Sequence, residues 1–259
     1  MDIATLGGFA GGMILLVLSI IVAGNSLSLF VDTGSFLIVI IGSLMALMAA
    51  NPLARTLGMM KFLKVAFNLK VYNKDELIRQ LVAFSESARK EGLLSLDDAL
   101  NDVEDEFMKG GMRLVVDGTD PDVIKKVLYT NLNQIEARHQ KGIGFVAGWK
   151  SIAPAFGMIG TLLGLIGMMA NLEDTASVGP NMALALVTTL YGSLFANLFL
   201  APLQMKLEDR NADEMLVKEI MIEGILSIQS GDNPRILEQK LYTFLPPSER
   251  PSAGGGIED

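Results

Sequence analysis

The chain has 259 residues, of which 50% are hydrophobic and 19% are charged, with no cysteine and a formal net charge of −8. The lack of cysteine excludes disulfides, thiol catalysis and cysteine-ligated metals, and the acidic balance argues against binding to nucleic acid. All 21 lysine and arginine residues lie within 51–150 and 204–259, outside several long apolar stretches. Such stretches cross bilayers, so the pattern predicts an all-α integral membrane protein and excludes most soluble enzymes.

Four apolar stretches predict four transmembrane helices, because roughly 20 residues rising about 1.5 Å each cross the hydrocarbon core of a bilayer. We place these spans at about 3–23, 34–50, 152–172 and 182–203. They form two hairpins, at 1–50 and 151–203. Met1-Asp2 lacks the basic start of a cleavable signal peptide.

The basic residues predict the orientation of these spans. They follow span two, precede span three and follow span four. The positive-inside rule therefore places both termini and the loop 51–150 in the cytoplasm. We expect this loop and the tail 204–245 to be helical. The end of the chain, 246–259, is rich in proline and glycine and is predicted to be disordered.

Two helices are predicted early in the cytoplasmic loop. Asp75–Glu91 places apolar residues on one helical face, and Gly92 ends that pattern. Ser95 with Asp98 resembles a capping box that opens the second helix.

Further helices are predicted before span three and after span four. Asp120 and Pro121 have the pattern of an N-cap and first helical position, and this helix can run on into span three. In the tail, 206–228 alternates charged and apolar residues as an amphipathic helix does. Asn233 before Pro234 opens one more short helix.

Span three carries four glycines on one helical face, which allows a neighbouring helix to approach closely. These are Gly157, Gly160, Gly164 and Gly167. The neighbour is either a helix of the same chain or a helix of another chain. We favour another chain.

Hydroxyl groups gather in the second hairpin, at Thr161 of span three and at Thr188 and Thr189 of span four. Each hydroxyl could bond the carbonyl one turn earlier and have no further role. Three hydroxyls at similar depth could also replace part of the water shell of a hard cation. No Asp, Glu, Lys, Arg or His lies within any span. Ion transport would therefore need a charged group from a different polypeptide.

Three prolines bracket the second hairpin. Pro154 is expected in the first turn of span three, Pro180 at the first position of span four, and Pro202 near the end of span four. Asp32 precedes Thr33 and is predicted to cap span two rather than to hold an ion.

Opposite charges flank Gly92 in the loop, with Arg89 and Lys90 before it and Asp97 and Asp98 after it. They form either a solvated helix surface or a docking patch for a partner of complementary charge. The sequence shows no nucleotide-binding loop, no nucleophile–base pair and no cluster for a tightly bound metal. We therefore predict that the chain is not an enzyme.

Together these features resemble the MotA/PomA family of flagellar-motor stator subunits. The resemblance covers residues 1 to about 245 and includes the order of two spans, long loop and two spans. Its motifs are the opening Met-Asp-Ile-Ala-Thr, the loop segment 88–94 (ARKEGLL), the segment 153–162 (APAFGMIGTL) and the segment 188–192 (TTLYG).

The resemblance implies a homopentamer in the bacterial inner membrane, without cofactor, around a single-span MotB/PomB partner that supplies a membrane aspartate. It implies an ion path at Thr161, Thr188 and Thr189, with sodium (Na+) favoured over protons (H+) by the paired threonines. It further implies conformational coupling through the three prolines. The four loop charges would face the rotor protein FliG, with Leu100 standing where some relatives have an acid.

Two alternatives remain. The related ExbB/TolQ proteins energise outer-membrane processes with a similar pentamer. That family has a single span before its large loop, whereas two spans precede the loop here. A purely structural membrane scaffold would make the threonines dispensable.

Overall fold

The computed structural model describes residues 3–53, 56, 58 and 72–250, and the regular elements within them are all helical. Four segments of this described part are long and apolar enough to cross a membrane, as predicted. The chain forms two compact units. We call residues 1–69 with 139–209 the membrane unit, and residues 70–138 with 210–259 the loop–tail unit. The tail 246–259 was predicted to be disordered, but its first residues form a 3-10 turn (Pro247–Glu249), and residues 251–259 lie outside the described part.

The membrane unit begins with the first hairpin. Its elements are α1 (Ile3–Val22), a 3-10 turn (Leu27–Phe30), α2 (Thr33–Phe36), a π-helical segment (Leu37–Gly42) and α3 (Ser43–Ala50). The carboxylate of Asp32 accepts a hydrogen bond from the Ser35 N–H at 2.5 Å, so the predicted cap of span two is confirmed.

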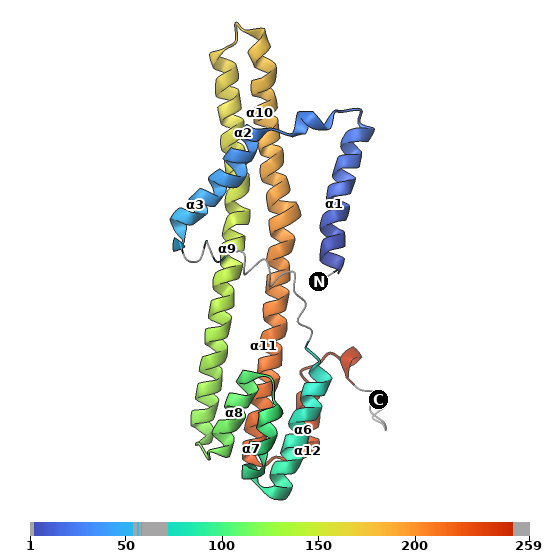
Figure 1. Cartoon of the computed structure of the whole chain (residues 1–259), viewed down its shortest axis with the longest axis vertical. Coiled ribbons are helices and arrows are strands. Elements are labelled where there is room, and N and C mark those ends of the chain that lie inside the picture. Colours follow the sequence, from blue (N-terminus) through green and yellow to red (C-terminus); the bar gives the residue numbers. More distant parts are fainter. Residues whose placement is uncertain (1–2, 54–55, 57, 59–71, 251–259) are drawn as a thin grey trace. The chain divides into compact units, whose positions relative to one another are not determined.

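The second hairpin is built from two longer helices than predicted. They are α9 (Pro121–Ala170), which contributes residues 139 onward to this unit, and α10 (Thr175–Leu194), which continues through a π-helical segment (Phe195–Leu200) into α11 (Ala201–Ser230). Figure 1 shows α9 and α10 side by side. Because α9 is continuous, the loop helix beginning at Asp120-Pro121 does run on into span three.

Two of the proline positions were predicted wrongly. Pro154 lies deep inside α9 rather than in a first turn. Helix α10 begins at Thr175, capped by the Asp174 carboxylate, so Pro180 is not its first residue. Proline at a helix start is common, but here an aspartate six residues earlier supplies the stronger start signal.

The π-helical segment before Pro202 has a physical reason. Proline lacks an N–H and its ring clashes with the carbonyl four residues earlier. A wide turn shifts the hydrogen-bond pattern, as the bond from the Ala201 N–H to the Ala196 carbonyl shows. The helix thereby continues past the proline.

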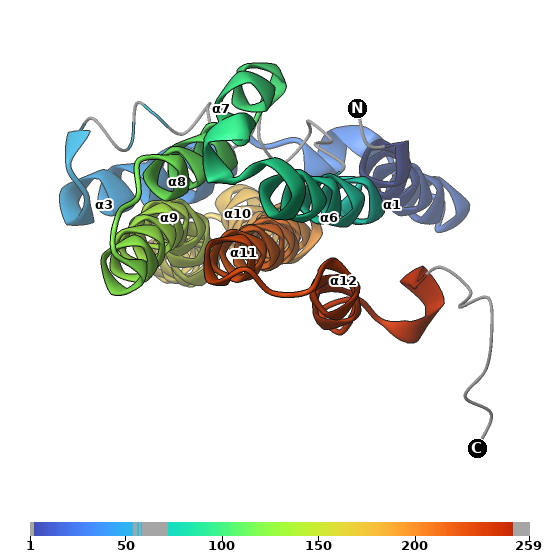
Figure 2. The same cartoon turned by 90° about the horizontal axis from the view of Figure 1, so that it is seen from below.

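The loop–tail unit is a bundle of shorter helices with the ends of the two long ones. Its elements are α6 (Lys74–Glu91), a 3-10 turn (Leu93–Ser95), α7 (Leu96–Ala99), a second turn (Leu100–Asp102), α8 (Glu106–Val116), the start of α9, the later part of α11, α12 (Pro234–Tyr242) and a turn (Pro247–Glu249). Figure 2 shows α6, α8 and α11 as neighbours, and Leu81 of α6 packs on Gly224 of α11.

The predicted helix ends are partly confirmed. Gly92 ends α6 with φ +89°, a value that favours glycine. Helix α7 begins directly after Ser95, as predicted, but the capping box does not form, because the Ser95 hydroxyl donates to the Gly92 carbonyl instead. The next helix, α8, is capped by Asp105, whose carboxylate accepts hydrogen bonds from the N–H groups of Phe107 and Met108. Residues 100–105, with a 3-10 turn at Leu100–Asp102, therefore separate α7 from α8.

The core of the loop–tail unit is made of large aliphatic and methionine side chains. Its most buried members include Ile78, Leu81, Leu96, Leu100, Met108, Met112, Ile124, Ile220, Ile225 and Leu237. In the membrane unit a smaller apolar cluster surrounds Trp149, whose ring meets Phe195 edge-on with ring centroids 4.9 Å apart.

Candidate functional site

Two hydroxyls meet on the exposed side of the second hairpin. Thr161 of α9 and Thr189 of α10 are hydrogen-bonded to each other. The Thr161 oxygen also lies 3.0 Å from the Ala185 carbonyl oxygen, and the Thr189 oxygen lies 3.3 Å from it. Three neutral oxygens thus converge on one spot. Oxygens of this kind are ligands for hard cations such as sodium.

Thr188 is placed differently from Thr189. Its side chain is fully buried, and its hydroxyl oxygen lies 2.8 Å from the Leu184 carbonyl and 3.0 Å from the Ala185 carbonyl. A Cβ built on Gly160 would lie 2.5 Å from the Thr188 Cβ. Successive residues of a helix point about 100° apart, so the two threonines cannot share one surface. The structure hydrogen-bonds Thr161 to Thr189, whereas Thr188 is bonded to neither of them and contacts the same Ala185 carbonyl oxygen from a buried position.

The glycine face of span three packs within the chain, which corrects the preference for another chain. A Cβ on Gly164 would lie 2.5 Å from the Asn181 carbonyl oxygen, and one on Gly157 would lie 3.0 Å from the Thr188 carbonyl oxygen. On the other helix, a Cβ on Gly192 would likewise lie close to the Ala153 carbonyl oxygen. The reason is the short connection after Ala170, which makes α9 and α10 antiparallel neighbours.

Polar side chains also join the two hairpins. The Tyr191 hydroxyl donates to the Phe30 carbonyl at 2.7 Å and accepts from the Asp32 N–H at 3.3 Å. The Trp149 indole N–H donates to the Ser43 hydroxyl at 2.9 Å. Sequence reasoning gave these groups no partners, because the partners are more than 100 residues away.

Two of the three prolines lie where a helix is tightly packed or irregular. A Cβ on Gly192 would lie 3.2 Å from the Cα of Pro154, so this proline is part of the α9–α10 contact. Pro202 follows the π-helical segment of the same long helix. Pro180 lies within the first two turns of α10.

The four loop charges lie at one end of the loop–tail unit. Arg89 and Lys90 are in the last turn of α6, Asp97 and Asp98 are in the first turn of α7, and all four are exposed. Between them lies Leu94, whose side chain is 77% exposed. We call these five residues the charged tip. A single exposed leucine is common on protein surfaces, and sequence reasoning had not singled it out.

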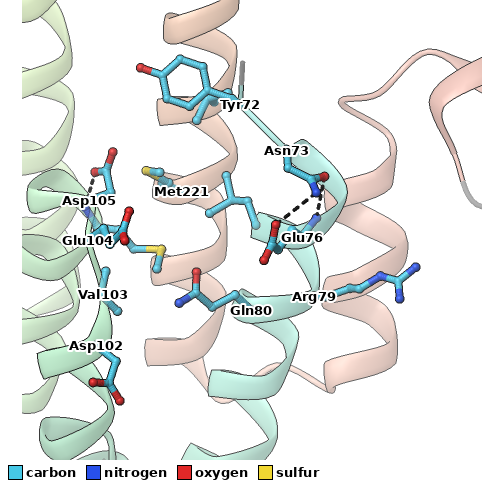
Figure 3. A pocket seen from close by; sticks show the side chains of 13 residues that line it. Tyr72, Asn73, Glu76, Arg79, Gln80, Asp102, Val103, Glu104, Asp105 and Met221 are labelled. Carbon is cyan, nitrogen blue, oxygen red and sulfur yellow. Dashed lines mark hydrogen bonds between the residues drawn. The ribbon is translucent and has the colours of Figure 1, made fainter. Parts of the chain in front are cut away.

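A groove of about 890 Å³ opens at the other end of α6 (Figure 3). Glu76 and Gln80 line one side, Asp102 and Glu104 line the other, and Met221 lies between them.

An ion pair lies beside this groove. The Lys218 ammonium is 2.8 Å from an Asp105 carboxylate oxygen and 5.0 Å from the centre of the Phe107 ring. Burial raises the pKa of Asp105, but the Lys218 bond and charge outweigh burial and the pKa is lowered from its usual 3.8. The pair is therefore charged at neutral pH and fastens α8 to α11.

No group of three acidic, histidine or cysteine side chains that could hold a metal ion gathers in the part of the chain that the structure describes. The oxygens at Thr161 and Thr189 are thus the candidate cation ligands that geometry offers.

Comparison with known proteins identifies relatives along nearly the whole chain. Residues 99–220 match the model of the MotA/TolQ/ExbB proton channel family. Motility protein A of Borreliella burgdorferi is 47% identical over 257 residues, which cover 99% of each chain. Chemotaxis protein PomA of Vibrio alginolyticus is 36% identical over 250 residues, covering 96% of this chain and 98% of PomA.

Solved structures show the same fold. The MotAB structure from C. jejuni superposes with a TM-score of 0.90 at 28% identity, covering 97% of this chain and 100% of that one. The flagellar MotAB stator complex from Bacillus subtilis gives a TM-score of 0.89 at 29% identity with the same coverage.

Proposed function

The chain belongs to the motility protein A family of flagellar stator subunits, and on that premise we propose that sodium ions pass its Thr161–Thr189 hydroxyl pair. It is an ion-conducting stator subunit and a multi-pass protein of the bacterial inner membrane. The two relatives described above are a motility protein and a chemotaxis protein, and both match nearly the whole chain, which favours the stator role over the ExbB/TolQ alternative. Since the stator role of these relatives is not enzymatic, we also propose that the chain catalyses no covalent reaction.

The convergence of three neutral oxygens carries the sodium proposal. A proton needs one acceptor at a time, whereas sodium loses water only where several oxygens replace it. Thr161 is part-exposed and Thr189 is exposed on the hairpin, so the remaining ligands come from water and from a second polypeptide. Thr188 supports this site from behind by filling the space at Gly160.

We assign the missing charge to a MotB/PomB-like single-span partner. The two superposed structures are MotAB complexes, and the predicted spans of this chain contain no Asp, Glu, Lys, Arg or His. A carboxylate from the partner facing the threonine pair would complete the site. By the same likeness we expect five copies of this chain around the partner, with both termini in the cytoplasm.

Torque would be passed on by the α9–α10 contact and delivered at the charged tip. Pro154 lies in that contact, Pro202 follows the π-helical segment, and Pro180 lies within the first two turns of α10. These prolines are proposed to allow the helices to bend during ion passage. Arg89, Lys90, Asp97 and Asp98 would steer the rotor protein FliG into place, and Leu94 would make the apolar contact.

The ion path is tested by replacing each threonine with valine, which keeps the shape and removes the hydroxyl. We expect Thr161→Val and Thr189→Val to need about tenfold more sodium for half-maximal swimming, since one lost oxygen ligand costs about 1–3 kcal/mol. Thr188→Val is the matched control and should change the sodium dependence by less than about twofold. Equal effects at all three positions, or wild-type swimming that ignores sodium, would contradict the proposal.

The rotor contact is tested by reversing Arg89 and Lys90 to glutamate together. We expect torque to fall while the amount of stator complex in the membrane stays the same, because these side chains are exposed. Lys126→Glu, another exposed position of the loop–tail unit, is the control and should leave torque unaltered. Normal torque in the Arg89/Lys90 variant removes the docking role.

A further inference from the structure

Two polar residues follow the threonine pair along the long helix that runs from α10 into α11 (Figure 1). Ser193 and Asn197 lie four and eight residues after Thr189, so the three side chains share one side of the helix. At about 1.5 Å per residue, Asn197 is about 12 Å beyond Thr189 along the helix axis. It therefore lies on the side of the threonine pair that is expected to face the cytoplasm.

Ser193 and Asn197 are the exposed positions of this part of the span. Of residues 190–200, all of which the structure describes, only these two are exposed. An exposed position that faces lipid is apolar, as Leu186 is, whereas polar residues within a membrane face a partner or a water-filled space. The side of the helix that carries Ser193 and Asn197 is therefore turned away from lipid.

A backbone oxygen at the same place has lost its helical donor. In an α-helix the Asn197 carbonyl accepts from the Ala201 N–H, but here that N–H bonds the Ala196 carbonyl. In the π-helical pattern the donor would be residue 202, which is Pro202 and has no N–H. Within this described helix the Asn197 carbonyl oxygen is therefore left without a main-chain donor. Such an oxygen is costly in a membrane unless a cation, water or another polar group satisfies it.

Side-chain oxygens accompany this carbonyl. The Asn197 amide nitrogen donates to the Ser193 carbonyl oxygen at 3.0 Å and lies 3.5 Å from the Ser193 hydroxyl oxygen. This bond uses the nitrogen of the amide and leaves its oxygen to bind a cation. The simpler interpretation is that Asn197 only bonds the carbonyl one turn earlier, as Asn171 does with Gly167. That interpretation does not account for the backbone oxygen that Pro202 leaves without a donor.

From these observations we propose that Ser193 and Asn197 form a second sodium site, which takes the ion from the threonine pair and releases it toward the cytoplasm. The proposal rests on the proposed function, because the ion must first arrive at Thr161 and Thr189. Carbonyl oxygens freed where a transmembrane helix is interrupted coordinate sodium in transporters. Two sites in succession let an ion move on, whereas one tight site would hold it. Pro202 then withholds the N–H that would otherwise occupy the site.

The test measures swimming speed against sodium concentration in cells that carry variants of the full chain together with its partner subunit. Asn197→Leu should lower the maximal speed about fivefold, the rate equivalent of one lost oxygen contact. The sodium concentration for half-maximal speed should not rise, because the ion still binds the threonine pair first. Asn197→Gln keeps an amide oxygen and should recover most of the speed. The matched control is Asn171→Leu, which removes an asparagine with the same kind of carbonyl bond and should swim like the wild type.

A smaller change carries the same test if Asn197→Leu reduces the amount of stator complex in the membrane. Ser193→Ala removes one hydroxyl from an exposed position and should leave the amount of complex unchanged. Its maximal speed should fall about threefold, again without a rise in the half-maximal sodium concentration. Wild-type maximal speed in Ser193→Ala or in Asn197→Leu overturns the proposal.

The backbone oxygen is tested by Pro202→Ala, which supplies the missing N–H. Because Pro202→Ala and Asn197→Leu remove the same site, the double variant should be no slower than the slower single variant. Losses that multiply would show that the two residues act independently and would overturn the proposal. Asn197→Gln that is as slow as Asn197→Leu, or an Asn197→Leu variant that needs more sodium, contradicts it as well.

The two proposals fail separately. If Thr161→Val and Thr189→Val shift the sodium dependence but Asn197→Leu swims at full speed, only the second site is wrong. If the threonine variants leave the sodium dependence unaltered, the proposed function itself fails.

Discussion

The helices inside each of the two units pack in different ways. In the membrane unit, α9 and α10 pack backbone against backbone, with glycines at the closest points and a buried threonine between them. In the loop–tail unit, large aliphatic and methionine side chains fill the space between helices. The difference follows from the solvent. In water, the hydrophobic effect drives apolar side chains into the core of the unit. In lipid this driving force is absent, so the attraction between helices comes from close packing.

The polar groups differ in the same way. Hydrogen bonds between hairpins in the membrane unit use neutral groups, such as Tyr191 with Phe30 and Trp149 with Ser43. The loop–tail unit instead buries the charged pair of Lys218 and Asp105. The free energy needed to remove a charge from water is offset where an opposite charge and several N–H donors contact it, as Lys218 and two N–H groups do at Asp105.

The largest expected effect is the loss of this pair. Lys218→Met should lower the free energy of unfolding by about 3 kcal/mol, because it leaves the Asp105 carboxylate half-buried without its cation. Lys74→Met is the control, since its partner Asp213 is exposed and such pairs contribute at most about 1 kcal/mol. Thermal unfolding of the purified complex measures both. Equal effects would mean that the loop–tail unit does not depend on its buried charges.

A smaller effect is expected from one methyl group in the membrane unit. Gly164→Ala should cost about 2 kcal/mol, because the new Cβ would meet the Asn181 backbone, which cannot move aside. Gly144→Ala, in the same helix with open space around it, should be neutral or stabilising by about 0.5–1 kcal/mol. If both variants melt alike, close backbone packing does not hold the hairpin.

The smallest effect is a dependence on pH. The lowered pKa of Asp105 means that its ion pair stabilises the fold above the ordinary value of 3.8 and that this contribution is lost as the pH falls through the lower folded value. Between pH 7 and 5 the unfolding temperatures of the wild type and Asp105→Asn should therefore differ by a constant amount. The difference should shrink only below about pH 4. A gap that closes near neutral pH would show that the carboxylate is not held by Lys218.

Helix signals in the sequence were reliable where the capping residue and the apolar pattern agreed. Asp32, Asp120 with Pro121, Gly92, and Asn233 with Pro234 all mark helix boundaries as expected. The prediction failed at Pro180, because the helix already begins at Thr175, where Asp174 caps it. At Ser95 a helix does begin, but it has four residues and no capping hydrogen bond, and Asp105 caps the next helix.

The candidate site was only partly predictable. The sequence identifies Thr161, Thr188 and Thr189 as unusual hydroxyls within apolar spans, but it gives them equal standing. Their separation into an exposed pair and a buried third depends on how α10 is rotated against α9, and that rotation is set by the glycines. Leu94 was missed for a related reason: exposure of a leucine is visible only once the turn around it is formed.

By itself the sequence determined the class of the protein, the four spans and the need for a charge from elsewhere, because these follow from the order of apolar and charged residues along one chain. Only the tertiary structure decided which helix meets the glycine face and which threonines share a cation site. Those choices depend on contacts between residues far apart in the sequence, where helix rotation and close approach, rather than local preference, set the energy.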